Sequence, residues 1–211
     1  MQKCNREVAR PTTIGQTRVM TGIASPELLA SVERALEEHG IDAVTLEHIA
    51  AEAGVNRVTL YRQGHTRETL LTATALQAAS EFRDAALPAL THPGTGAARL
   101  DLLLDALFDL ADRHLALLAG LYDGPTAIFH LAVEDHRVLT RLEYTEPFAR
   151  ILADGVRDGT LTSRDPTEDA EILFNLAGWT YIHLRRSHGW SSKRTRVGVR
   201  RQLGATIAPR A

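Results

Sequence analysis

The sequence predicts an all-α protein of about nine helices, and three observations support this prediction. Apolar residues recur at every third or fourth position within each long segment, which is the spacing of an amphipathic helix. Residues that start or end helices, such as Ser25-Pro26-Glu27, Gly40 and Asp165-Pro166, stand at the ends of these segments. No segment shows the alternation of apolar and polar residues that is typical of a half-buried strand.

The bulk composition limits the classes of protein to which the chain can belong. Its 211 residues can form a small head and a larger body, and the net charge of −2 gives no global sign of nucleic-acid binding. Cys4 is the only cysteine, which excludes a disulfide framework and a thiolate metal cluster. No apolar run approaches the roughly 18–20 residues of a membrane span, and no signal-peptide core is present. We expect a soluble, cytoplasmic protein without a membrane partner.

Residues 1–24 show no periodicity and contain scattered basic residues, so we expect a disordered arm. Two interpretations remain open: a basic arm that lies along a nucleic acid, or a chain whose true start is Met20.

The first helix begins at Pro26, with Ser25 as its cap, and ends at Gly40. A helix, a tight turn and a second helix follow between Thr45 and Thr66, with Thr45 and Asn56 as the two N-caps. Counted from Leu46, a helix-turn-helix needs apolar residues at places four, ten and fifteen, a small residue at five and glycine at nine. Those places hold Ile49, Val55, Leu60, Ala50 and Gly54.

This pattern predicts that Val55 and Leu60 are buried and that the opposite face of the second helix, 57–62, is free to enter a DNA major groove. The free face carries side chains that can reach phosphates or base edges: Asn56, Arg57, Thr59, Tyr61 and Arg62. The alternative is an ordinary helical hairpin with a solvated polar face.

The remaining segments predict helices over 66–90, 97–121, 135–157, 165–187 and 191–208. Pro147 interrupts the third of these, so we expect a kink there. The last segment is strongly basic, and two interpretations are open: a second nucleic-acid surface, or a helix face paired with acids.

Residues Ser25 to Leu71 resemble the DNA-binding head of the tetracycline-repressor (TetR) family of bacterial transcription regulators. The resemblance rests on Gly40, on Thr45 to Ala50, on Ala53-Gly54-Val55, on Thr59 to Arg62, and on Arg67-Glu68 with Leu70-Leu71. It implies a helix-turn-helix domain over 25–70 and an effector-binding and dimerisation domain over 71–211.

The resemblance also implies which residues touch DNA. Phosphate contacts are expected from Thr45, Thr59, Tyr61 and Arg67, and contacts near the groove floor from Asn56 and Arg57. The sequence departs from the family pattern at four places, which predicts a smaller core in the head and a looser turn after the second helix of the motif: Leu36, Ile41, Gly64 and His65.

In the body, the resemblance implies that the last two helices, about 166–187 and 192–206, pair with a second copy in a four-helix bundle. The expected interface residues are Leu173, Ala177, Gly178, Leu184, Val199 and Leu203.

An effector pocket is expected among the helices of residues 97–187, although core packing is the alternative for each candidate. The candidates are Phe108, His114, Tyr122, Phe129, His130, Tyr144, Phe148, Phe174, Trp179 and His183.

The predicted function is a ligand-responsive repressor that binds a palindromic operator as a homodimer and releases it when a small molecule binds. No cofactor is expected. One alternative is a helical small-molecule-binding protein that has lost specific DNA binding. A metal enzyme could use His130, Glu134 and His136, but the chain has no His-Glu-x-x-His or paired Glu-x-x-His motif, so we expect no enzymatic activity.

Overall fold

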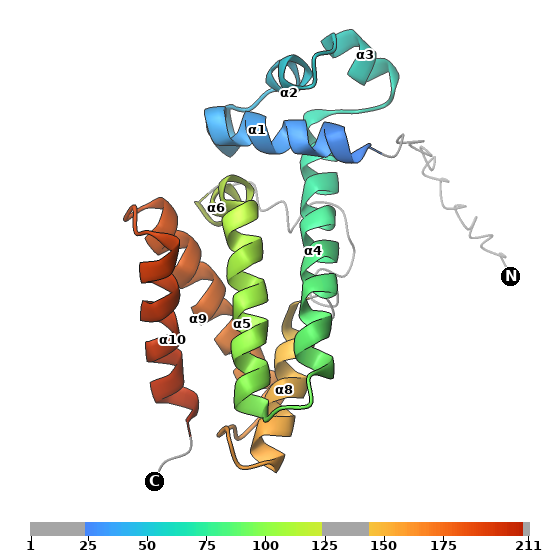
Figure 1. Ribbon diagram of the computed structural model, residues 1–211. Coiled ribbons are helices and arrows are strands. Elements are labelled where there is room, and N and C mark those ends of the chain that lie inside the picture. The colour runs from blue at the N-terminus through green and yellow to red at the C-terminus, as the bar shows by residue number, and fades with distance from the viewer. Residues whose placement is uncertain (1–23, 124–143, 209–211) are drawn as a thin grey trace, which may run out of the picture.

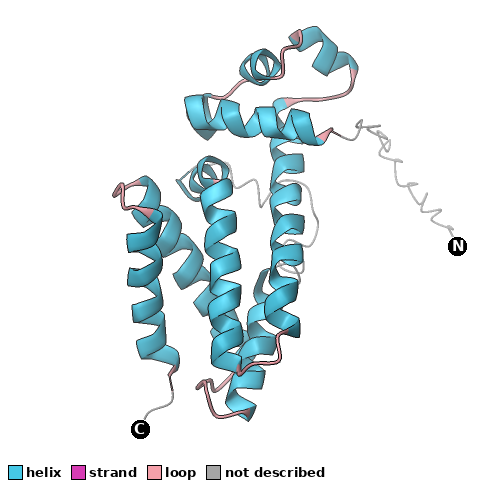
Figure 2. Ribbon diagram, viewed as in Figure 1, coloured by secondary structure: helices cyan, strands magenta, loops and turns pink. Residues whose placement is uncertain are grey.

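The computed structural model describes residues 24–123 and 144–208, and these residues form nine helices and no strand (Figure 2). The helices are α1 (Pro26–Ala43), α2 (Leu46–Glu52), α3 (Arg57–Arg62), α4 (Arg67–Thr91), α5 (Gly96–Arg113), α6 (Leu115–Asp123), α8 (Glu146–Arg157), α9 (Pro166–Arg186) and α10 (Ser192–Ile207). The predicted all-α class is therefore confirmed.

The first three helices form a small head at one end of α4 (Figure 1). Its core contains Val32 and Leu36 of α1, Ile49 of α2, Leu60 of α3 and Leu70 of α4, all of which are buried. Leu117 and Leu121 of α6 complete the same core. The head therefore shares its apolar core with a helix of the body.

The body is built around α4 and α5, which run side by side away from the head (Figure 1). Helix α8 packs on α5, and α9 and α10 pack on each other beside α5. Large side chains fill the body core, and the completely buried ones include Phe82, Phe108, Phe148, Ile151 and Tyr181.

The turn before α5 brings two backbones into direct contact. A Cβ placed on Gly96 would lie 2.2 Å from the Cα of Gly155 in α8, so only glycine fits at this crossing. The amide of Gly96 donates to Asp158 Oδ2 at 2.7 Å, and that of Ala97 donates to Thr160 Oγ1 at 3.1 Å. The glycine-rich turn thus fixes the crossing of α5 and α8.

The single helix predicted over 97–121 is wrong, because the chain changes direction at His114. This residue caps α5 with φ −109° and ψ 30°, and α6 then packs against α1. A Cβ on Gly120 would lie 2.4 Å from Ile41 Cγ2, which shows how closely α6 approaches the end of α1. The apolar periodicity continues through the corner because α6 also buries one face, although against the head.

Pro147 lies in the first turn of α8. The part of the predicted 135–157 helix before residue 144 lies outside the described residues, so the kink expected at Pro147 stays a prediction. One further expectation differs from the structure. Val55 is 40% exposed, because the chain turns at Gly54 and directs this side chain away from the head core.

No helix of the described ranges is both long enough and apolar enough to cross a membrane.

Candidate functional site

The geometry of α2 and its start is set by local hydrogen bonds. Thr45 Oγ1 accepts a bond from the amide of His48 at 3.2 Å, and the amide of Thr45 donates to His48 Nδ1 at 3.3 Å. These reciprocal bonds satisfy two amides at the helix start, as in a capping box. Thr45 therefore has the N-cap role that the sequence predicted.

The turn between α2 and α3 is equally local. Gly54 has a φ of 64°, in the left-handed region that favours glycine. The amide of Val55 then donates to the carbonyl of Ala50 at 3.0 Å. Asn56 Oδ1 accepts from the amide of Val58 at 2.8 Å and starts α3. The predicted boundaries of α3, residues 57 and 62, agree with the structure.

Helix α3 buries Leu60 and leaves its other side chains exposed. Tyr61 is 69% exposed, and Arg57, Thr59 and Arg62 are exposed as well. These exposed residues share the short helix α3, which lies at the end of the molecule farthest from α8 (Figure 1). Such a surface, with guanidinium, hydroxyl and phenol groups, can donate hydrogen bonds to phosphates and base edges.

One cation of this surface is already paired within the head. Arg57 Nη1 lies 2.5 Å from Glu47 Oε1 of α2, and both side chains are more than half exposed. The pair aligns the guanidinium along the outside of the motif. It also places one carboxylate beside the surface that would meet DNA phosphates.

Arg67 is held differently from the expectation that it contacts phosphate. Its Nε donates to the carbonyl of Val44 at 2.7 Å, and one of its terminal nitrogens donates to the carbonyl of Ile41. The guanidinium therefore joins the start of α4 to the end of α1 and to Val44, which follows it. With its side chain 24% exposed, Arg67 stabilises the head from inside more than it offers a free cation.

The turn after α3 is closed by hydrogen bonds, although Gly64 and His65 depart from the family pattern. Gly64 has a φ of 82°, and the amide of His65 donates to the carbonyl of Leu60 at 3.0 Å. His65 is itself buried, which leads the chain back into the core before α4. In the turn between α3 and α4, Gly64 and the buried His65 therefore occupy the positions at which the family pattern has an aromatic residue and a proline.

Sequence reasoning missed Val58, which is 52% exposed on α3. The sequence could have indicated its exposure, because Val58 is apolar and Leu60 is the residue that α3 buries. An exposed methyl-bearing side chain on a recognition helix can contact the C5-methyl group of thymine.

A second candidate site is a cavity of about 120 Å³ in the body. Three of the predicted effector residues line it, namely Tyr144, Phe174 and Trp179. The ring of Tyr144 lies 5.3 Å from that of Phe174, centroid to centroid. The other lining residues come from α5, α6 and α9: Leu107, Leu110, Ala111, Leu118, Asn175, Gly178 and Ile182.

The remaining predicted effector residues do not line this cavity, or their side chains lie outside the described part of the structure. Phe108 is completely buried against Tyr181, and Phe148 is completely buried behind Phe174. His183 is exposed, and His114 contacts two carboxylates at the α5–α6 corner. Tyr122 belongs to α6, but its side chain lies outside the described part of the structure, as do Phe129 and His130.

Most of the residues predicted for the dimer interface are buried within the body of the same chain. Leu173, Ala177, Val199 and Leu203 are buried in the body core, and Leu184 is half-buried against it. Gly178 lines the cavity. The helical period identified apolar positions correctly, but these positions face α5 and the facing helix of the same chain. The large apolar side chains left on the surface of α9 and α10 are Ile172, Leu176 and Val197, at 50%, 49% and 60% exposure.

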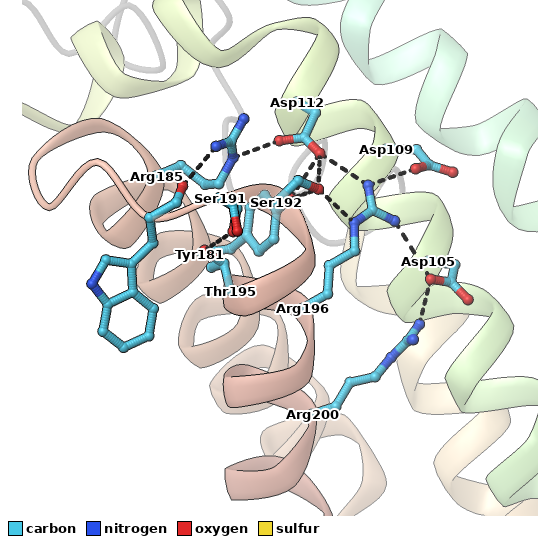
Figure 3. A network of polar contacts seen from close by, with 11 residues as sticks. Asp105, Asp109, Asp112, Tyr181, Arg185, Ser191, Ser192, Thr195, Arg196 and Arg200 are labelled. Carbon is cyan, nitrogen blue, oxygen red and sulfur yellow. Dashed lines mark hydrogen bonds and ion pairs between the residues drawn. The ribbon is translucent and has the colours of Figure 1, made fainter.

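Two basic residues of α10, Arg196 and Arg200, are paired with acids of α5 (Figure 3). Arg196 Nη2 lies 2.6 Å from Asp109 Oδ1 and 3.0 Å from Asp112 Oδ2, and Arg200 Nη2 lies 2.5 Å from Asp105 Oδ1. Of the two interpretations of this segment, an acid-paired helix face agrees with the structure at these two arginines.

Asp112 is the centre of this network, which we call the Asp112 network. It accepts from Arg185 Nε at 2.8 Å, from Tyr181 Oη at 2.8 Å and from Ser192 Oγ at 2.7 Å, in addition to Arg196. Burial alone would raise the pKa of Asp112, but the hydrogen bonds outweigh it and lower the pKa from 3.8 to about 2. The carboxylate therefore stays ionised and joins α5, α9 and α10.

Within the described ranges, no group of three or more His, Cys, Asp or Glu side chains is arranged to hold a metal ion. Glu134 and His136, the other two residues of the alternative metal site, lie with His130 outside those ranges.

Comparison with known proteins agrees with this geometry. Residues 28–74 match the family model described as "Bacterial regulatory proteins, tetR family". An uncharacterised HTH-type transcriptional regulator of Mycobacterium tuberculosis is 38% identical over 77 residues, which are 36% of this chain and 35% of that protein. The matched part thus spans about a third of the length of the curated relative.

Similarity to solved structures extends over nearly the whole chain. A transcriptional regulator of the TetR/AcrR family from Thermobifida fusca has a TM-score of 0.64 at 24% identity, covering 84% of this chain and 94% of that one. A protein from Saccharomonospora viridis, solved in complex with choline, has a TM-score of 0.70 at 18% identity and covers 87% and 97%. At these identities the similarity establishes the fold. Residues 28–74 thus match the helix-turn-helix domain of the tetR family, and the described helices share their fold with TetR/AcrR regulators of known structure.

Proposed function

We propose that this protein is a DNA-binding transcriptional regulator, a homodimeric repressor that releases its operator when a small molecule binds to the body. The observation that carries the proposal is the outer surface of α3, where four polar side chains are exposed together on a helix that is fixed by local caps. The function requires no reaction at this surface, only binding.

In the proposed complex, α3 enters the major groove. Arg57 and Val58 face base edges, because they stand in the first turn of the helix, and Thr59, Tyr61 and Arg62 contact phosphates. Thr45 and Asn56 fix the two helices by capping and bring backbone amides near the phosphates. Arg67 acts by holding the loop before α2 in place.

The proposed dimer uses the outer faces of α9 and α10. Ile172, Leu176 and Val197 are exposed there, and a groove of about 270 Å³ between the two helices is lined by Leu176, Leu184 and Trp190 among others. A second copy packed on this face would place two recognition helices on one side of the DNA. Half-sites of the operator would then be about 34–36 Å apart, or a multiple of this distance.

The proposed effector site is the cavity between α5, α6 and α9. Its described lining is mostly aliphatic and aromatic, with the Asn175 side chain as its polar group besides Tyr144 and Trp179. The Asn175 amide is already engaged, because its Oδ1 accepts from Trp179 Nε1 at 2.9 Å and its Nδ2 donates to the carbonyl of Glu171 at 2.7 Å. These features favour a small, largely apolar ligand with an aromatic or aliphatic body.

Helix α6 connects the cavity to the head. Leu118 of α6 lines the cavity, and Leu117 and Leu121 of the same helix belong to the core of the head. A ligand that displaces α6 would therefore move α1 and change the spacing of the two recognition helices in the dimer. A coupling of about 1–3 kcal/mol would change operator affinity by roughly 5–150-fold.

The experiment that tests this function is selection of binding sites from a pool of random DNA by the purified protein. The expected result is a palindrome whose half-sites are separated by one helical turn or a multiple of it. The same selection with Arg57→Ala should recover altered or unrelated sequences, and selection with Arg150→Ala, an exposed arginine of α8, should recover the same palindrome. Recovery of no preferred sequence by the wild-type protein would refute the proposal.

A further inference from the structure

His114 lies between carboxylates of two different helices. Its Nδ1 is 2.7 Å from Glu33 Oε1 of α1, and its Nε2 is 3.0 Å from Glu81 Oε2 of α4. The imidazole is buried at the corner between α5 and α6. Three parts of the molecule thus meet at one side chain: the head, the long helix α4 and the body.

The two contacts determine the protonation state of the ring. A neutral imidazole carries one N–H, and an ionised carboxylate can only accept hydrogen bonds. Both ring nitrogens must therefore carry hydrogens for both bonds to exist. Burial alone would lower the pKa of His114, but the hydrogen bonds and charges of Glu33 and Glu81 outweigh it and raise the pKa above its ordinary value.

The two carboxylates are not held equally. Glu81 also accepts from Gln77 Nε2 at 2.8 Å and lies 3.5 Å from Arg113 Nε. Although burial would raise the pKa of Glu81, its bonds to His114 and Gln77 and the charges of His114 and Arg113 lower it. When His114 loses a proton, Glu81 keeps its other partners. A neutral ring carries one N–H and can donate to only one of the two carboxylates, so loss of a proton from His114 opens the bridge between α1 and α4.

The rest of the contact between head and body at this corner is apolar. Leu117 and Leu121 of α6 pack into the head core, and Gly120 lies against Ile41. This apolar packing holds α1 close to α6. The hydrogen bond from His114 to Glu33 is directional and joins α1 to the same point that holds α4.

We propose that His114 is a positioning residue for operator binding: as an imidazolium it joins Glu33 to Glu81 and fixes the angle of the head relative to the body. This inference rests on the proposed function, because a dimer binds a palindrome only if both heads are held at the correct separation. Deprotonation removes one of the two bonds and opens the bridge between α1 and α4, so the affinity for the full palindrome is present below the pKa of His114 and is lost above it.

The test compares two DNA molecules: the full palindrome and the same DNA with one half-site scrambled. Affinity is measured at constant ionic strength from about pH 6 to about pH 9, because the pKa of His114 is raised above its ordinary value. For the wild-type protein, we expect affinity for the full palindrome to fall by about fivefold or more as His114 deprotonates, which is the lower end of typical coupling between sites. Affinity for the single half-site should change little, because one head needs no fixed angle to its partner.

Two variants remove the bridge, and one serves as a matched control. His114→Gln and Glu33→Gln should bind the full palindrome weakly throughout and lose the pH dependence, with half-site affinity kept. His188→Gln changes an exposed histidine after α9 and should behave like the wild-type protein. Because histidines of the head, such as His65, remain in every variant, pH dependence that they cause would persist in His114→Gln and Glu33→Gln.

A pH-independent wild-type affinity, or an equal loss on both DNA molecules, would overturn the positioning role. If the protein selects no DNA at any pH, the proposed function fails separately. The bridge is then judged by NMR of the His114 ring nitrogens. Two protonated nitrogens at neutral pH and a lower pKa in Glu33→Gln would support it, and a neutral ring unaffected by Glu33→Gln would overturn it. Should His114→Gln fail to fold, Glu33→Gln carries the same comparison.

Discussion

Arg57 of the recognition helix lies 2.5 Å from Glu47 of α2, so the arginine proposed to face DNA is paired with an acid of the same motif. Both side chains are more than half exposed, and pairs of this kind contribute about 0–1 kcal/mol to stability. The pair therefore has more effect on the charge of the DNA-facing surface than on folding.

Glu47→Gln should strengthen DNA binding, because it removes a negative charge beside the phosphates and releases the guanidinium. We expect a several-fold gain on specific and unrelated DNA alike, with the thermal midpoint unchanged. Fluorescence anisotropy at fixed ionic strength measures the affinity. Weaker binding in Glu47→Gln would mean instead that the carboxylate holds Arg57 in its binding geometry.

Val58 should recognise thymine. Replacement by alanine removes two methyl groups, and each apolar carbon buried against a thymine methyl is worth about 0.8 kcal/mol. We expect Val58→Ala to weaken operator binding several-fold. Replacing the contacted thymine by deoxyuridine, which lacks the methyl group, should weaken wild-type binding by a similar factor and have little effect on Val58→Ala. Additive losses would show that the two groups do not touch.

Gly178 offers a way to fill the cavity without removing a side chain. A Cβ at this position meets no atom within 4 Å, and Gly178 lines the cavity. Gly178→Leu should therefore occupy part of its 120 Å³, keep operator binding and abolish release by the effector. Gly204→Leu on α10, where a Cβ also meets nothing, is the matched control and should keep the response. Release that is unchanged in Gly178→Leu would place the effector elsewhere.

The Asp112 network should dominate the acid stability of the body. Because the pKa of Asp112 is lowered to about 2, the stability that this carboxylate contributes is complete above its ordinary pKa of 3.8 and is lost as pH falls through about 2. Asp112→Asn should lower the free energy of unfolding at neutral pH by about 1–3 kcal/mol, because two arginines lose a charged partner. Urea denaturation measures this change. Asp109→Asn, which removes a more exposed carboxylate, should cost less.

Local chemistry explains why the DNA-facing motif could be predicted from the sequence. Thr45, Gly54 and Asn56 make their decisive contacts within a few residues of themselves, so spacing alone places α2, the turn and α3. The same applies to Asp165, whose side chain caps α9 through the amides of Thr167 and Glu168.

Contacts between distant residues explain what the sequence could not predict. Arg67 is held by carbonyls more than 20 positions away, and His114 by Glu33 at a separation of 81. The sequence around Arg67 and around His114 contains no pattern that predicts these partners. Likewise, the period of α9 marks Leu173 and Ala177 as apolar, but it does not reveal whether α5 or a second copy covers them.

A salt titration of binding to the DNA that flanks the protein's own gene, compared with unrelated DNA, shows whether α3 recognises an operator. We expect tighter binding to the flanking DNA, with a log–log slope of about −0.9 for each phosphate contact. Arg57→Ala and Tyr61→Phe should weaken this preference, and Arg150→Ala should leave it unchanged. Weak binding that is equal on both DNAs and indifferent to Arg57 and Tyr61 would contradict the claim that α3 recognises an operator.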